Sequence, residues 1–396
     1  MSSADLLLGV MVAGLTAYAL LAGADFGGGV WDLLARSHEA GDVRTLVAGA
    51  LGPVWEANHV WLIFVIVAMF SGFPPAFGVV GSTLELPLAL ALVGIVLRGA
   101  AYVYRAYGDG GAGPDHWWGH VFAAASTITP FALGISGAAL ATGDLSPDDP
   151  AAPLTSPFGL VAGVFAVVAT AFLAAVYLCR DAASSPAAEH LVPYFRRRAL
   201  GGAVTAGALA TVLLPLLWRD APVVASRFTE RALPFVALSA AGGIAALALV
   251  WRRRFTLARL AAGLAVAAVL WGWAAAQYPD LVVGHTTVTD AAAPTANIHA
   301  LLLAIGGGIV ALVPALLTLF RLFSHPEPPT PPPAPNHQHA AEHQQKPTHH
   351  RKRRRRPRGC GAVPELAEDT DEALTAQCVD LVEEQDQRPG AGPRPG

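Results

Sequence analysis

The sequence predicts an all-α, polytopic membrane protein. Of its 396 residues, 54% are hydrophobic and only 14% are charged, whereas about 25% of the residues of an average soluble domain are charged. Apolar stretches approaching the roughly 20 residues that a helix needs to cross a bilayer recur as far as residue 323. Their number predicts about nine transmembrane helices.

The apolar stretches follow one another in chain order. They lie at residues 6–22, 55–70, 79–101, 122–140, 158–178, 200–217, 233–250, 257–276 and 298–320. The first has no basic segment and no cleavage-like site before its apolar run, so we expect a retained helix rather than a signal peptide.

Most arginines before residue 324 lie in alternate loops. They are Arg36, Arg44, Arg98, Arg105, Arg180, Arg196 to Arg198, Arg252 to Arg254 and Arg259, while the loop at residues 144–156 carries acids and no Lys or Arg. The positive-inside rule then predicts a multi-pass membrane protein with its N-terminus outside and its C-terminal tail in the cytoplasm. Arg219, Arg227 and Arg231 oppose this orientation, because they fall in an expected outer loop.

The composition changes after the last apolar stretch. Residues 324–396 hold a proline run, a group of histidines and a basic run at residues 351–356. Such a segment cannot bury a core, so we expect a disordered Pro/His/Arg-rich tail after a transmembrane helical domain at residues 1–323. Its basic run is expected to contact anionic lipid headgroups rather than nucleic acid.

The second apolar stretch begins with polar side chains. Glu56, Asn58 and His59 stand between Trp55 and Trp61, inside or at the edge of the hydrocarbon, where a charge costs about 2.5–3.5 kcal/mol. One interpretation makes Glu56 and Asn58 interfacial caps beside belt tryptophans. The other is functional: Glu56 and His59 share a helix face and form a proton relay or half a metal site.

Other polar residues within the spans have two interpretations. Asp25, before the glycines at residues 27–29, either caps a helix break or is a buried, protonatable carboxylate. Arg98 either extends to the interface or neutralises a buried carboxylate or a cofactor propionate. Gln277 carries an amide able to bond across helices, and the glycines at 27–29 and 306–308 predict close helix packing.

Metal ligation has little support in this sequence. No second His or Cys within a span offers an evident partner for His59, and the three cysteines, Cys179, Cys360 and Cys378, form no CxxC pattern. We therefore assign no haem ligand, metal site, disulfide or catalytic residue to this chain.

Several segments together resemble subunit II of the cytochrome bd-type quinol oxidases, including the cyanide-insensitive branch. They are Gly-Ala-Asp-Phe-Gly at residues 23–27, Pro-Val-Trp-Glu-Ala-Asn-His-Val-Trp-Leu at 53–62, Phe-Ser-Gly-Phe-Pro at 70–74, and the segments at 97–105, 157–163 and 272–279. Their order and spacing make the resemblance specific, and it covers residues 1 to about 323.

The resemblance implies two four-helix bundles plus one peripheral helix, in a heterodimer with subunit I in the bacterial plasma membrane. That partner is expected to carry two b-type haems and one d-type haem, and to bind quinol and O2. This chain would support assembly of the partner and supply part of the cytoplasmic proton path. A structural quinone or lipid and a small accessory membrane subunit are compatible with the resemblance.

The resemblance also implies roles for residues. Asp25 and Glu56 match acids of the family's proton path, with Trp55 and Asn58 beside them, and Arg98 and Arg105 match its basic pair. The chain departs from the family pattern at two places. Glu56 stands where members often have aspartate, and Ala22 stands where many have a second acid.

Two other function classes remain open from the residues alone. A multi-helix secondary transporter also has buried carboxylates, but such proteins tend to have broken helices at matching points of two halves. The glycine clusters here fall in the first and ninth apolar stretches, without an evident internal repeat. The second class is a structural scaffold in which the polar residues serve helix packing alone.

Overall fold

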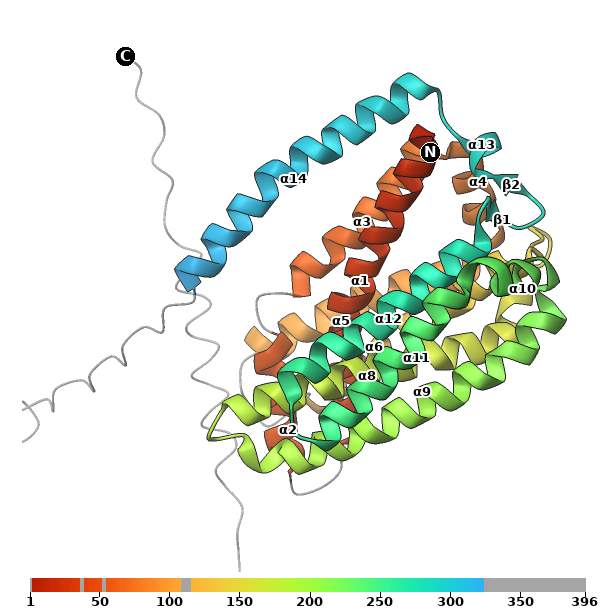
Figure 1. Ribbon diagram of the computed structural model, residues 1–396. Coiled ribbons are helices and arrows are strands. Elements are labelled where there is room, and N and C mark those ends of the chain that lie inside the picture. The colour runs from red at the N-terminus through yellow and green to blue at the C-terminus, as the bar shows by residue number, and fades with distance from the viewer. Residues whose placement is uncertain (1, 36–38, 52–54, 108–114, 324–396) are drawn as a thin grey trace, which may run out of the picture. The chain divides into compact units, whose positions relative to one another are not determined.

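The computed structural model describes residues 2–35, 39–51, 55–107 and 115–323. The first half of the described chain forms a bundle of four long helices (Figure 1). They are α1 (Ser3–Leu34), α3 (Trp55–Gly72), α5 (Glu85–Tyr107) and α6 (Asp115–Thr142). α1 packs on α3 and α6, and α5 packs on α6.

A second bundle of four helices follows. It consists of α8 (Pro157–Ser184), α9 (Val192–Asp220), α11 (Leu233–Trp251) and α12 (Phe255–Gln277). α8 also packs on α1 and α6, so it joins the two bundles. α14 (Thr295–Phe323) contacts α1 and α3 from outside both bundles (Figure 1). The expected two four-helix bundles plus one peripheral helix are therefore confirmed.

The remaining elements are short and connect the long helices. They are α2 (Ala40–Leu51), α4 (Pro74–Thr83), α7 (Ala152–Thr155), the 3-10 turn Glu189–Leu191, α10 (Pro222–Arg227), the π-turn Phe228–Ala232, α13 (Val288–Ala291), and the antiparallel pair β1 (Asp280–Val282) and β2 (Thr286–Thr287). The tail expected at residues 324–396 lies outside the described residues.

All nine predicted apolar stretches fall on helices, but the number of membrane spans is smaller. Seven helices of the described chain are long and apolar enough to cross a membrane, or eight if α3 and α4 form one bent span. α14 adds a shorter apolar stretch, Thr295–Ala311. The chain is an integral membrane protein, and the predicted count of nine is approximate.

The chain bends by 119° between α3 and α4. Pro74 and Pro75 begin α4 and cannot donate backbone hydrogen bonds to the preceding turn, and Pro74 keeps Phe73 out of the helical conformation. A second break occurs at Leu84, so the predicted stretch at residues 79–101 is split between α4 and α5. Glu85 therefore begins a helix and is exposed.

α1 runs through its glycines without a break, so the interpretation of Asp25 as a cap for a helix break is wrong. A Cβ at Gly27 would overlap the backbone carbonyl of Thr170 on α8, and one at Gly29 would overlap Ser126 on α6. These glycines allow close packing of α1, as predicted. A Cβ at any of the glycines at residues 306–308 would meet no atom within 4 Å, so these glycines make no such close contact within the described chain.

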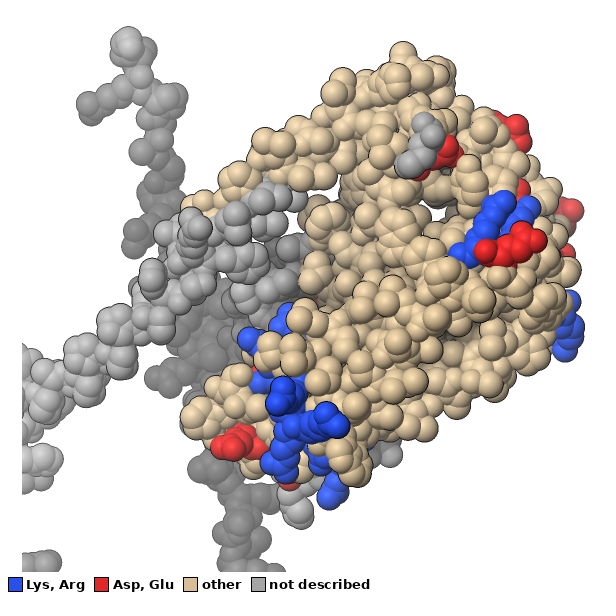
Figure 2. All heavy atoms as spheres, viewed as in Figure 1, with Lys and Arg blue, Asp and Glu red and all other residues tan. Residues whose placement is uncertain are grey.

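Charged side chains gather at the two ends of the helices on the face seen in Figure 2, and a wide zone without them lies between. The arginines that oppose the predicted orientation are held by local partners. Arg227 Nη1 donates to Asp280 Oδ2 at 2.6 Å, and Arg231 Nη1 donates to the Tyr278 carbonyl at 2.8 Å. At the same end, the negative charge of Asp5 raises the pKa of the Tyr278 hydroxyl.

Candidate functional site

Three buried polar residues lie on one face of α1. Tyr18, Asp25 and Asp32 are separated by seven residues each, which is about two helical turns. Their exposed fractions are 4%, 7% and 4%. Because two of them carry carboxylates inside a membrane-spanning helix, their partners decide what this face can do.

Asp25 is bound by a side chain of α3. The Asn58 side-chain amide donates a hydrogen bond from Nδ2 to Oδ2 of Asp25, and Asn58 is 2% exposed. The amide oxygen of Asn58 has no hydrogen-bond partner among the described residues. The structure thus brings together two of the predicted site residues, which are 33 positions apart in the chain.

Arg98 of α5 is buried beside this pair. It is 2% exposed, and its guanidinium carbon lies 5.0 Å from the ring centre of Phe26 and 5.1 Å from that of Phe122. Arg98 therefore does not extend to the membrane interface, and that interpretation is wrong. Its positive charge attracts the Asp25 carboxylate, while the aromatic faces stabilise the cation.

His59 and Trp61 complete the described part of the site. The His59 ring meets Tyr18 and Phe26 edge to face, with centroid distances of 6.2 and 6.3 Å. Trp61 is partly buried against the apolar cluster that contains Tyr18 and Phe26. The side chains of Trp55 and Glu56 lie outside the described residues, although their backbone begins α3.

A second charged group lies two turns further along α1. Asp32 accepts from Arg44 Nε at 2.9 Å and from Arg105 Nη1 at 2.6 Å. Arg105 also lies 5.1 Å from the ring centre of Phe122, the ring that Arg98 contacts. Arg44 is 46% exposed, so this group connects the buried cluster with the surface.

Tyr18, Asp32 and Phe122 were not singled out as candidate residues by the sequence analysis. The spacing of seven that relates Tyr18 and Asp32 to Asp25 is the signal that could have found them, since it places three polar residues on one helix face. Phe122 carries no such signal, because its role depends on two arginines of another helix.

Gln277 does not belong to this cluster. Its side chain donates from Nε2 to the Leu140 carbonyl at 2.9 Å, near the C-terminal end of α6. Leu140 is about 27 Å along that helix from Phe122, at a rise of about 1.5 Å per residue. The expected bond across helices exists, at a place remote from Asp25.

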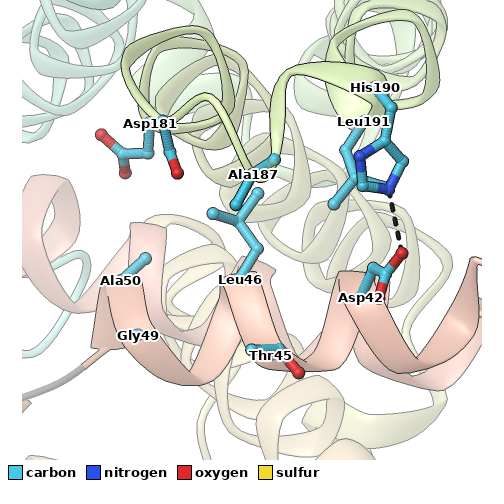
Figure 3. A pocket seen from close by; sticks show the side chains of 11 residues that line it. Asp42, Thr45, Leu46, Gly49, Ala50, Asp181, Ala187, His190 and Leu191 are labelled. Carbon is cyan, nitrogen blue, oxygen red and sulfur yellow. Dashed lines mark hydrogen bonds and ion pairs between the residues drawn. The ribbon is translucent and has the colours of Figure 1, made fainter. Parts of the chain in front are cut away.

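A surface pocket also lies outside the cluster. It has a volume of about 580 Å³ and lies between α2, the end of α8 and the segment before α9 (Figure 3). Its one histidine, His190, bonds to Asp42 at 2.9 Å. A haem needs an axial ligand inside a deep apolar pocket, and this open site does not fit one.

The described residues also contain no group of three or more His, Cys, Asp or Glu side chains placed to hold a metal ion. Instead of metal binding, the Asp25 cluster offers the chemistry of a carboxylate in a dry protein interior. Such a group can take up and release a proton, while the amide of Asn58 keeps it in one orientation and Arg98 balances its negative charge.

The family model described as "Cytochrome bd terminal oxidase subunit II" matches residues 3–323. The chain is 32% identical over 87 residues to the putative cytochrome bd menaquinol oxidase subunit II of Bacillus subtilis (strain 168), which is 22% of this chain and 25% of that protein. It is 28% identical over 184 residues to the cytochrome bd-I ubiquinol oxidase subunit 2 of Escherichia coli (strain K12), 44% of this chain and 46% of that protein. The matched stretches thus span less than half of these curated relatives.

A solved structure has a similar fold. It is described as "The structure of bd oxidase from Geobacillus thermodenitrificans", and the match has a TM-score of 0.68 at 23% sequence identity. It covers 82% of this chain and 99% of that chain. The arrangement of helices described above is therefore shared along nearly the whole of the solved chain.

Proposed function

The chain belongs to the cytochrome bd terminal oxidase subunit II family, and from this membership we propose that it is one subunit of a quinol oxidase in the respiratory chain. The complex oxidises quinol and reduces O2 to water. The family is that of a haem-containing oxidase complex, and the match over residues 3–323 does not favour a secondary transporter.

Its partner is subunit I, with which it forms a heterodimer. We assign two b-type haems, one d-type haem and the quinol and O2 sites to that partner, as the resemblance to this family implies. Electron transfer and oxygen chemistry belong to those groups. A small accessory membrane subunit and a structural lipid or quinone are part of the same proposal.

This chain supports assembly and carries protons toward the partner. The observation that carries the proposal is the hydrogen bond from Asn58 to the buried carboxylate of Asp25. Reduction of O2 consumes protons in a dry interior, so a carrier must cross apolar protein, and a carboxylic acid is neutral when loaded. Asn58 orients the acid, and Arg98 balances the charge left when the proton departs.

Glu56, which stands three residues before His59 in the sequence, is proposed as the second proton-carrying acid. Asp32 has a different, structural role. It is bound by two arginines, and these ion pairs hold the end of α1 to α2 and α5. The arginine-rich ends then lie in the cytoplasm and the N-terminus outside, which makes the Asp32 group the cytoplasmic end of α1.

The proposal is tested by purifying the tagged chain from its native membrane in mild detergent. The expected eluate contains a haem-bearing partner, gives b and d bands in the reduced-minus-oxidised spectrum, and takes up oxygen when quinol is added. A stable, colourless chain that elutes alone without oxygen uptake would contradict the oxidase assignment. Normal uptake by an assembled Asp25→Asn variant would contradict only the proton role.

A further inference from the structure

A second pocket lies at the other side of the end of α8, against the turn that joins α11 to α12. Its volume is about 330 Å³, and it is open to the surface. Arg180 of α8, together with Arg253 and Arg254 of the turn, lines it, with the hydroxyl-bearing residues Ser184 and Thr256. No acidic residue lines this pocket, so it favours an anion.

The positive charges of the two arginines that line the pocket from the turn are not paired within the described chain. Arg253 and Arg254 are exposed and make no side-chain hydrogen bond or ion pair with the described residues. Arg180 has only a long ion pair, 3.7 Å, with Asp181. By contrast, Arg196 beside them donates to the carbonyls of Val250 and Trp251 at 3.1 and 2.8 Å and so caps α11.

The backbone adds donors to the same pocket. Phe255, Thr256 and Leu257 form the first turn of α12, whose N-terminus has no side-chain cap. The first amides of a helix lack intrahelical acceptors and favour a negative charge. Arg253 is held at φ 57°, a conformation that favours glycine.

Large apolar side chains lie next to the pocket, along the two helices that the turn joins. Trp251 is 68% exposed, Leu257 is 48% exposed and Leu260 is 68% exposed. An anion bound at the turn would therefore have apolar helix surface beside it. That arrangement suits a molecule with a phosphate at one end and acyl chains at the other.

We propose that this pocket binds the phosphate of an anionic membrane lipid through Arg180, Arg253, Arg254 and the N-terminus of α12. Arginine forms bidentate, charge-assisted hydrogen bonds with phosphate oxygens, and the helix amides accept the same charge. The acyl chains lie against α11 and α12, and the lipid ties the end of α8 to the α11–α12 turn.

The test uses the complex purified with its partner, and the probes are dioleoyl phosphatidylglycerol, dioleoyl phosphatidylcholine and inorganic phosphate. Each is titrated into the detergent solution while the thermal unfolding midpoint is measured. We expect phosphatidylglycerol to raise the midpoint at lower concentration than the other two. In the double variant Arg253→Gln/Arg254→Gln, the half-saturating concentration should rise by about tenfold or more.

Arg252→Gln is the matched control, because Arg252 is exposed in the same turn but does not line the pocket. It should bind phosphatidylglycerol like the parent chain. Arg180 lies on another helix, α8. Arg180→Gln should also raise the half-saturating concentration of phosphatidylglycerol, and it replaces the double variant as the test if that variant unfolds. An equal response to inorganic phosphate would refute a lipid site, and equal weakening by the control would refute a specific one.

Discussion

Asn58 of α3 donates a hydrogen bond to the carboxylate of Asp25 of α1, and both side chains are buried. The bond joins two helices at a depth where neither polar group can be satisfied by bulk water. Under the proposed function, the amide in this position has two roles. It offsets the free-energy cost of burying the carboxylate, and it leaves the acid able to bind and release a proton.

Asp25→Asn should leave the complex assembled and slow its turnover by about tenfold or more, because an amide replaces the acid at nearly the same size but carries no proton. The measurement is quinol-driven oxygen uptake per haem, with the visible spectrum reporting assembly. Glu85→Gln is the control, since Glu85 is an exposed acid at the start of α5. A slow control would show that the effect is not specific to the buried acid.

Glu56→Gln should slow oxygen uptake in an assembled complex, whereas Glu56→Asp should keep activity. The aspartate variant retains a carboxylate, so the pair separates proton carriage from side-chain packing. Both variants are assayed at equal haem content. Normal uptake with glutamine would refute the relay role of Glu56, and an assembled but inactive aspartate variant would count against simple proton carriage.

Arg98→Met should lower the stability of the complex by about 3 kcal/mol, because it leaves the Asp25 charge buried without its cation. The measurement is the yield of assembled complex and its thermal unfolding midpoint. The double variant Arg98→Met/Asp25→Asn removes both charges and should recover part of the lost stability. Independent, additive losses would mean that the two residues do not interact.

Gly27→Ala should disrupt the contact between α1 and α8, since the added methyl group would overlap the carbonyl of Thr170. We expect less assembled complex in the membrane, measured by haem spectra of solubilised material. Gly306→Ala is the matched control, because nothing lies within 4 Å of the corresponding Cβ. Equal yields from the two variants would contradict close packing at Gly27.

The apolar stretches could be located in advance because spanning a bilayer depends on a run of neighbouring residues. Nine stretches were predicted and all nine are helical. The family also follows from local segments, such as the one at residues 53–62, read in order. Asp25, Asn58 and Arg98 were identified as candidates for a similar reason, since a polar residue within an apolar run is conspicuous without any coordinates.

The partners of these residues depend on packing between distant segments, which no local pattern contains. Only the folded chain places Asn58 on Asp25, buries Arg98 between Phe26 and Phe122, and binds Asp32 with Arg44 and Arg105. The two glycine triplets make the same point. Both resemble packing motifs, but α8 lies closely against the first, whereas a Cβ at any glycine of the second would meet no described atom within 4 Å. Hydropathy depends on residues that are neighbours in the sequence, whereas packing depends on residues that are far apart in it.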